Sequence, residues 1–146
     1  MGKMGILVVD DDADFRESMK IILEGEGYSI DSASSGNEAL KLLDERMYFL
    51  VLTDMVMPGL TGMELLEKIK ADYLMTEVIM ISGYGTIDKA VEAMKKGAFG
   101  FFVKGNDIES LISEIKKAET IRNLKNENYV LKSRINKVPY LIESKN

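Results

Sequence analysis

The sequence predicts a three-layer α/β protein in which a doubly wound parallel sheet of five strands lies between helices. Short continuous apolar runs, typical of strands buried on both faces, alternate with segments whose apolar residues recur at helical spacing. This alternation repeats five times, which favours parallel βαβ units with right-handed crossovers. Four of the runs end in polar residues, as expected where the carboxyl ends of strands form a ligand crevice. The strand order expected for this pattern is 2-1-3-4-5.

The first half of the chain provides two strands and two helices. Residues 6–9 form an apolar run, and residues 28–32 alternate between apolar and polar side chains, which suits an edge strand. The first helix is expected to end at Gly25 and Gly27, and Ser35 is the predicted N-cap of the second. The side chains expected to face inward from these two helices are Phe15, Met19, Ile22, Leu23, Ala39, Leu40, Leu43 and Met47.

The second half repeats the pattern three times. Strands are predicted at residues 49–53, 78–81 and 99–103. Thr61, Thr86 and Asp107 are the predicted caps of the helices that follow these strands, and the last helix is expected to be the longest. The apolar positions of the third, fourth and fifth helices are Met63, Leu65, Leu66 and Ile69, then Ile87, Ala90, Val91 and Met94, then Leu111, Ile112 and Ile115.

Composition narrows the possible functions. The 146 residues suffice for one domain with an appendage, and the net charge of −5 argues against direct contact of this chain with nucleic acid. No apolar stretch approaches the roughly 20 residues of a membrane-spanning helix, so we expect no membrane insertion and no secretory signal. The chain lacks cysteine and histidine, which excludes disulfides, disfavours zinc and fits a cytoplasmic location.

The polar residues at the strand ends form one predicted site. Asp10 and Asp11 follow the first strand and Asp54 follows the third, and the expected strand order places these two strands side by side. Clustered carboxylates repel one another unless a cation joins them, and Mg²⁺ prefers oxygen ligands. We therefore predict Asp11 as a direct ligand, Asp10 as a ligand through water and Asp54 as the third carboxylate. The alternative for residues 10–12 is a helix N-cap, the role expected of Asp12.

Asp54 is also the best candidate for a covalent nucleophile, because carboxylates form phosphoryl intermediates and a metal can activate them. Lys104, at the end of the fifth strand, is expected to pair with Asp54 at rest and with phosphoryl oxygens afterwards. Ser82, at the end of the fourth strand, offers a hydroxyl for a phosphoryl oxygen, and the loop 83–85 could move with it. The alternative for Asp54 is a residue that caps the turn before Pro58.

Four motifs resemble those of the receiver domains of bacterial two-component response regulators, over about residues 5–120. They are VVDD at 8–11, TDMVMPG at 53–59, ISGYGT at 81–86 and FVK at 102–104. The resemblance implies a flavodoxin-like (βα)5 fold and a sensor histidine kinase that transfers phosphate to Asp54. It also implies Mg²⁺ held by Asp10, Asp11, Asp54 and the backbone carbonyl of Val56, with Ser82 and Lys104 as the family's hydroxyl and lysine. The family's aromatic switch position falls on Phe101.

Residues 83–98 are most similar to NtrC-type transcriptional activators, in which a linker leads to an ATPase domain and a DNA-binding domain. We therefore expect a receiver domain at 1–120 and, at 121–146, a linker helix or coiled coil leading to output domains absent from this chain. Residues 141–144 resemble the start of such an ATPase domain, so the chain is expected to be part of a longer protein.

Two positions depart from the family pattern. Gly105 stands where the family has a proline that is often in a cis peptide, and a trans bond is expected here because a non-proline cis bond costs about 2.5–4 kcal/mol. Phe101 lacks the hydroxyl of the more usual tyrosine, so its switch can act only through packing.

The C-terminal segment carries a short heptad pattern. With Ile121 at a, the remaining core positions are Leu124, Asn128, Leu131, Ile135 and Val138. An asparagine at one a position fixes the register of two-stranded parallel coils, and Glu127 and Lys132 could pair between chains. We predict a parallel homodimer through this helix and the adjoining receiver face. The alternative is a solvated helix that frays beyond residue 125.

Three functions remain open at this stage. The leading one is a signalling domain that catalyses its own phosphotransfer and dephosphorylation, without acting as an enzyme on other substrates, and that controls dimerisation and a transcriptional output. The second is a receiver-like module that dimerises without phosphorylation, for which Lys104-Gly105 is the support. The third is a phosphatase, which would need a second acid or base beside Asp54.

Overall fold

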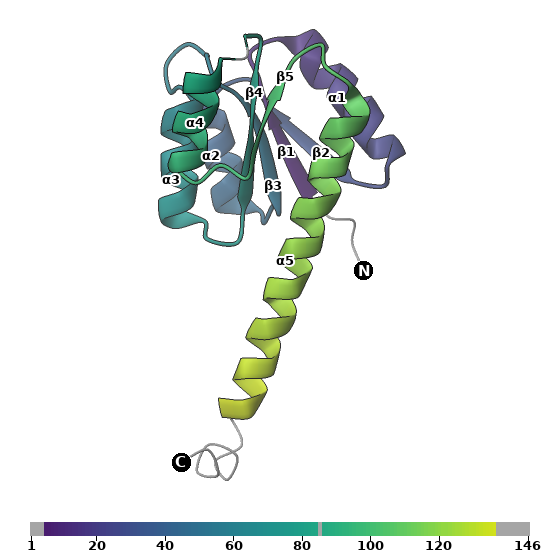
Figure 1. The fold of residues 1–146 in the computed structure, drawn as a ribbon, viewed down its shortest axis with the longest axis vertical. Coiled ribbons are helices and arrows are strands. Elements are labelled where there is room, and N and C mark those ends of the chain that lie inside the picture. The colour runs from purple at the N-terminus through teal and green to yellow at the C-terminus, as the bar shows by residue number, and fades with distance from the viewer. Residues whose placement is uncertain (1–4, 85, 137–146) are drawn as a thin grey trace.

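Five parallel strands form the centre of the computed structural model, which describes residues 5–84 and 86–136, the last ten of them as backbone only. The strands are β1 (Gly5–Val9), β2 (Ser29–Ala33), β3 (Leu50–Asp54), β4 (Glu77–Ser82) and β5 (Gly100–Val103). Their order in the sheet is β2-β1-β3-β4-β5 (Figure 1). The predicted fold class and strand order are both confirmed.

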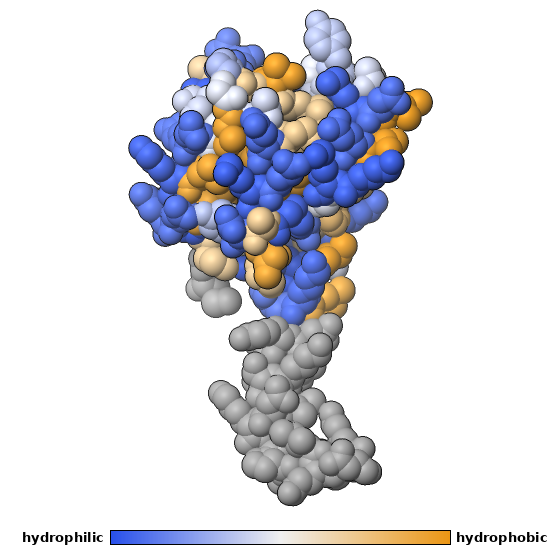
Figure 2. Space-filling view, turned by 90° about the vertical axis from the view of Figure 1, so that its left-hand side faces the viewer, coloured by the Kyte–Doolittle hydropathy of each residue, from blue (hydrophilic) through white to orange (hydrophobic). Residues whose placement is uncertain are grey.

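Helices cover both faces of this sheet. They are α1 (Ala13–Gly25), α2 (Gly36–Glu45), α3 (Gly62–Asp72), α4 (Ile87–Lys95) and α5 (Ile108–Asn136). Figure 1 shows α1 and α5 on one side of the strands and α2, α3 and α4 on the other. The side seen in Figure 2 is largely hydrophilic, with hydrophobic residues interspersed.

The sheet is buried on both faces, which explains the continuous apolar runs. Successive side chains of a strand point to opposite faces. Ile6 and Val8 of β1 therefore pack in the core beneath α1 and α5, whereas Leu7 and Val9 pack in the core beneath α2, α3 and α4. All four side chains are almost completely inaccessible to solvent.

The predicted helix starts are confirmed by side chains that accept hydrogen bonds from backbone amides. Asp12, Ser35, Thr61 and Thr86 cap α1 to α4, and the cap of α3 is a full capping box. Asp107 accepts a hydrogen bond from a backbone amide in the first turn of α5. Each such cap contributes about 1 kcal/mol to the stability of the protein. The caps therefore define where each loop at the carboxyl end of a strand ends and the next helix begins.

Predictions of inward-facing residues are wrong at three places. In α1, Ile22 is 37% exposed, and only Met19 and Leu23 of that helix are buried. Met47 is 73% exposed, because α2 ends at Glu45 and the extended backbone of Arg46 breaks the helical period. In α4, the side chains of Ile87, Val91 and Met94 are exposed, and only Ala93 is fully buried. The helix packs through its small residue, so its large apolar side chains lie on the outer face.

The long helix α5 is anchored to the domain by polar contacts as well as by its core residues. The Tyr28 hydroxyl donates to Glu119 at 2.8 Å. Lys125 lies 3.3 Å from Glu77 at the start of β4. As predicted, the helix continues beyond the sheet, to Asn136. The heptad position Val138 lies outside the described residues. None of the described helices has the length and apolar character needed to cross a bilayer.

Leu65 and Leu74 form a matched pair for testing the core. The Leu65 side chain is fully buried beneath the sheet, whereas Leu74 is 73% exposed. Leu65→Ala is expected to lower the free energy of unfolding in urea by about 2–5 kcal/mol, because it leaves a cavity. Leu74→Ala is expected to change it by less than about 0.5 kcal/mol. Equal losses in both variants would contradict the observed packing.

Candidate functional site

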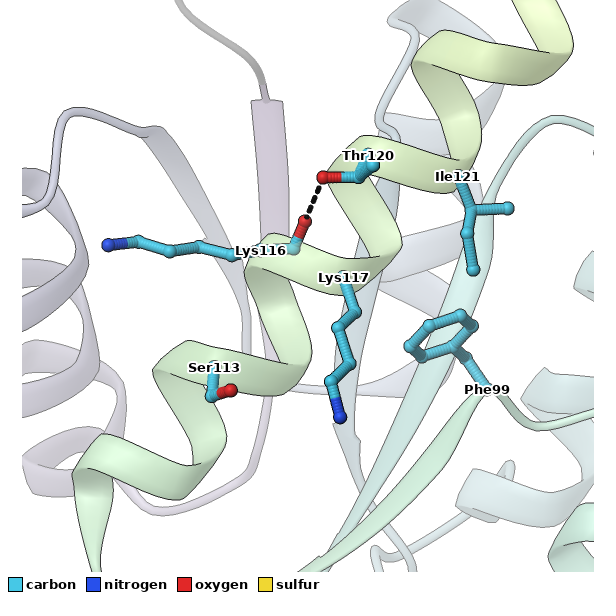
Figure 3. A pocket seen from close by; sticks show the side chains of 6 residues that line it. All are labelled: Phe99, Ser113, Lys116, Lys117, Thr120 and Ile121. Atoms are coloured by element: carbon cyan, nitrogen blue, oxygen red, sulfur yellow. Dashed lines mark hydrogen bonds between the residues drawn. The ribbon is translucent and has the colours of Figure 1, made fainter.

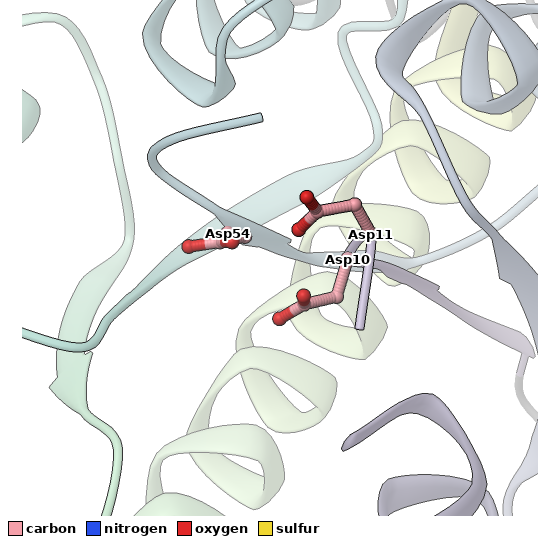
Figure 4. Close-up of side chains that lie close together, drawn as sticks. All are labelled: Asp10, Asp11 and Asp54. Atoms are coloured by element: carbon pink, nitrogen blue, oxygen red, sulfur yellow. The ribbon is translucent and has the colours of Figure 1, made fainter. Parts of the chain in front are cut away.

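Three aspartates meet at the carboxyl ends of β1 and β3. Asp10 and Asp11 follow β1 directly and Asp54 ends β3; the two strands are paired, with Val9 opposite Thr53. One carboxylate oxygen from each aspartate lies within 4.8 Å of the other two (Figure 4). The predicted clustering of these side chains is confirmed. All three offer hard oxygen ligands, the donor type that suits Mg²⁺.

Asp10 is the most rigidly held member of the cluster and is completely buried. Its backbone amide donates to Ala33 at 3.1 Å. Its Oδ1 accepts from the amide of Asp12 at 2.9 Å, and its carbonyl oxygen accepts from the guanidinium of Arg16 at 2.7 Å. Arg16 was not predicted from the sequence, although its place in the first turn of α1, close to the Asp triplet, is a usable signal.

Lys104 pairs with Asp10 in this structure, and not with Asp54 as predicted. Its Nζ lies 2.8 Å from Asp10 Oδ2 and 4.4 Å from the centre of the Phe15 ring. The physical reason is burial: a fully buried carboxylate requires a counter-charge more than a half-exposed one does. Burial by itself would lower the pKa of Lys104, but its hydrogen bond and charge interaction with Asp10, reinforced by Asp54, raise it overall.

Asp54 carries a destabilised negative charge. Its burial, followed by the charge of Asp10, raises the pKa of its carboxyl, and the positive charge of Lys104 only partly opposes this. The backbone amide of Val56 approaches Asp54 Oδ1 at 3.5 Å, the longest distance for a hydrogen bond. A cation bound among the three carboxylates would remove this repulsion. The ligand role of the Val56 carbonyl remains a prediction.

Gly62, the first residue of α3, lies directly behind Asp54. A Cβ atom on Gly62 would lie 2.1 Å from the carbonyl oxygen of Asp54, which leaves no room for a side chain. The Gly62 amide donates to the carbonyl of Met55 at 3.0 Å, so the start of α3 supports the loop after β3. This residue was not predicted from the sequence. A glycine at the first position of a helix, where it is a poor helix former, was the available signal.

Ser82 ends β4 next to the acidic cluster. Its strand neighbour Ile81 pairs with Asp54, and the Ser82 side chain is nearly buried. The Ser82 hydroxyl donates to the carbonyl of Tyr84 at 2.6 Å and accepts from the Tyr84 amide at 3.1 Å. In this structure the hydroxyl therefore holds the loop that follows β4. A hydrogen bond donated by Ser82 to any other group therefore requires release of the Tyr84 carbonyl.

The two remaining predicted positions lie on and after β5. Phe101 is half-buried and packs against the core beneath α2, α3 and α4, where a change of packing could reach α4; its switch role remains a prediction. The Lys104–Gly105 peptide bond is trans, as predicted. Gly105 has a φ of 90°, which favours glycine.

Comparison with known proteins places these features in one family. Residues 6–116 match the family described as "Response regulator receiver domain". A putative NtrX-like response regulator of Rickettsia bellii is 37% identical over 137 residues, which cover 92% of this chain and 29% of that protein. The chain thus spans less than a third of the length of the relatives it matches.

Solved structures agree with the sequence match. NtrX from Brucella abortus, in complex with ADP, superposes with a TM-score of 0.83 and 34% identity, over 93% of this chain and 30% of that one. The response regulator TrrA from Thermotoga maritima, in complex with Mg²⁺–BeF, superposes with a TM-score of 0.72 and 34% identity, over 79% of this chain and 98% of that one. The predicted similarity to NtrC-type regulators is confirmed.

Gly62→Ala tests whether the close approach of α3 positions Asp54. The added methyl group must push back the Asp54 backbone, so we expect the cluster to bind Mg²⁺ at least about tenfold more weakly, equivalent to 1.4 kcal/mol. Calorimetric titration measures this. Gly25→Ala is the matched control, since a Cβ there meets nothing within 4 Å. Wild-type affinity in Gly62→Ala would contradict the prediction.

Asp54→Asn tests the repulsion within the cluster. Because the folded-state pKa of Asp54 is raised, its stabilising contribution is present below the ordinary carboxyl pKa of about 3.9 and is lost as pH rises through the raised value. In EDTA at pH 7 the variant should therefore unfold at a higher urea concentration than the wild type. The difference should shrink towards zero as the pH falls to 4 and below. A difference that does not change with pH would contradict this explanation.

Proposed function

The chain belongs to the response regulator receiver family, and we propose that it is a phosphorylatable signalling switch with Asp54 as the phosphoryl acceptor. The observation that supports this most directly is the arrangement of one half-exposed aspartate among two further carboxylates, within the electrostatic reach of Lys104. Asp54 is partly exposed to a donor, and burial together with the charge of Asp10 raises the pKa of its carboxyl.

The proposed chemistry divides among the side chains. A carboxylate oxygen of Asp54 forms a bond to phosphorus while the bond from phosphorus to the donor nitrogen or oxygen breaks. Lys104 neutralises a phosphoryl oxygen, and Ser82 donates a hydrogen bond to another. Bound by Asp10, Asp11, Asp54 and the Val56 carbonyl, Mg²⁺ would neutralise charge that develops on the phosphoryl oxygens. Hydrolysis of the acyl phosphate by water returns Asp54 to its resting state.

The proposed switch follows from the contacts of Ser82. To donate to the phosphoryl group, the Ser82 hydroxyl must give up the hydrogen bond that it donates to the Tyr84 carbonyl, which loosens the loop before α4. The outward-facing apolar side chains of α4 would then change position together with the packing of Phe101. The outer face of α4 is suited to transmitting this change of position, because Ala93 is the one fully buried side chain that holds the helix against the core.

A second copy of the chain is the proposed partner at α5 and the adjoining receiver face. Ile121 and Leu124 are exposed on α5 although both are apolar. Beside them lies a cavity of about 410 Å³ between α5 and the start of β5 (Figure 3). Its lining residues are Phe99, Ser113, Lys116, Lys117, Thr120 and Ile121. Residues 127–136 are helical, as the proposed coiled coil requires.

The remaining partners follow from the chemistry and from the relatives. The chain has no histidine, so the phosphoryl donor is another protein, a sensor histidine kinase, or a small acyl phosphate. We place this exchange in the cytoplasm. The relatives extend well beyond the matched region, and NtrC-type regulators are the similar proteins, so control of a transcriptional output domain is the proposed consequence.

The proposed acceptor is tested by the intact mass of the protein after incubation with acetyl phosphate and Mg²⁺. We expect one phosphoryl adduct, which is absent from Asp54→Asn and from samples with EDTA. Fast hydrolysis is controlled by adding beryllofluoride with Mg²⁺, a stable phosphoryl analogue, and following the amide resonances of Ser82 and Tyr84. No adduct, together with no response to the analogue, would favour the phosphorylation-independent dimerisation module.

Sedimentation velocity, with and without beryllofluoride, tests the proposed dimer. Leu124→Lys is expected to weaken self-association at least about tenfold, because it puts a charge at an apolar position of the interface. Leu74→Lys is the matched control, since Leu74 is also an exposed leucine, at 73% against 56% for Leu124, but lies outside α5. A wild-type chain that stays monomeric at high concentration in both conditions would support the fraying helix instead.

A further inference from the structure

The ammonium group of Lys104 lies between two different partners. Its Nζ is 2.8 Å from Asp10 Oδ2 and 4.4 Å from the centre of the Phe15 ring. A cation within about 6 Å of a ring centre is attracted to the electron-rich face of the ring. Phe15 is itself held in place, because it lies in the first turn of α1 and packs against the core beneath α1 and α5.

Only the lysine head group is free to leave this arrangement. Asp10 is fixed through its amide, its carbonyl and its Oδ1, so its carboxylate cannot follow a departing partner. The backbone of Lys104 is fixed as well, since its amide donates to the carbonyl of Ser82 at 2.7 Å. Any exchange of cations at Asp10 Oδ2 therefore requires the Lys104 side chain to swing away from both Asp10 and Phe15.

We propose that Phe15 is a positioning residue that holds Lys104 on Asp10 in the metal-free protein and thereby sets how readily Asp10 becomes available to Mg²⁺. The inference rests on the proposed function, in which Asp10 belongs to the metal site and Lys104 serves the phosphoryl group. Lysine and the divalent ion compete for one buried carboxylate. The ring stabilises only the lysine-bound state, because its face is occupied only while Lys104 stays there.

The direction of the effect follows from this competition. Without the aromatic face, Lys104 leaves Asp10 more easily, so Mg²⁺ binds more tightly, and the released ammonium is free to serve Asp54. A cation–π contact of ordinary strength corresponds to about a twofold to tenfold change in the dissociation constant. A purely structural role of Phe15 predicts the opposite result, because loosening the start of α1 would disturb Asp10 and Asp11 and weaken metal binding.

The experiment is a calorimetric titration of Mg²⁺ into the EDTA-treated chain and three sets of variants. Phe15→Leu keeps an apolar side chain without a ring, and we expect tighter Mg²⁺ binding by about twofold to tenfold. Phe15→Tyr keeps the ring and should remain within about twofold of the wild type. In a Lys104→Gln background, Phe15→Leu should have no effect. Thermal unfolding of each variant confirms that it is folded.

A second measurement observes the contact directly. In the metal-free wild type, the ε-methylene protons of Lys104 should show an upfield ring-current shift in the NMR spectrum, which disappears on saturation with Mg²⁺ and in Phe15→Leu. Absence of this shift in the metal-free protein would overturn the inference. So would unchanged or weaker Mg²⁺ binding by Phe15→Leu, or an equal effect of this substitution in the Lys104→Gln background.

These outcomes separate the inference from the proposed function. If the wild type binds Mg²⁺ and gains a phosphoryl adduct but Phe15→Leu does not bind more tightly, the inference alone fails. If the wild type shows the ring-current shift but binds no Mg²⁺ at millimolar concentrations, the competition is overturned together with the proposed function.

Discussion

Uncompensated negative charge at the carboxyl ends of β1 and β3 is the constraint around which the rest of the site is arranged. Parallel pairing of these two strands brings three aspartates together, and the buried one must be neutralised within the protein. Lys104 neutralises Asp10. The Lys104 backbone follows β5 directly, and its ammonium group contacts the Phe15 ring. The same ion pair leaves Asp54 with only the long contact to the Val56 amide and a partial charge interaction with Lys104, which is why we propose Asp54 as the phosphoryl acceptor.

The loops around the site differ in how firmly hydrogen bonds and packing hold them. The loop after β3 is supported by Gly62 in close contact, and the loop after β1 by Arg16 and the Asp12 cap. Among the described residues, the hydroxyl of Ser82 holds Tyr84 in the loop after β4, and this loop leads through the Thr86 cap to a helix with one fully buried side chain. The proposed chemistry at Asp54 would therefore act on a firmly held cluster next to a less firmly held segment, an arrangement that suits a two-state switch.

Pattern and spacing in the sequence predicted the strand order, the helix caps and the gathering of Asp10, Asp11 and Asp54, because burial and capping follow local rules. They did not predict which carboxylate Lys104 contacts, since that depends on the relative burial of two side chains at the ends of paired strands. The outward face of α4 was missed for a related reason. Helical spacing identifies residues that share a face, but a small residue such as Ala93 can determine which face meets the sheet.

The substitution of Gly105 for the family's proline is the one sequence feature that favours a scaffold without phosphorylation, and its structural setting weakens that interpretation. Gly105 adopts a φ of 90° in a tight turn in which the Asn106 amide donates to the carbonyl of Val103 at 3.1 Å. This turn leaves the Lys104 amide bonded to Ser82 and its ammonium group on Asp10. The glycine therefore changes how the loop leaves the strand without removing the lysine from the site, and a chain used only as a scaffold would have no need to keep that lysine among three carboxylates.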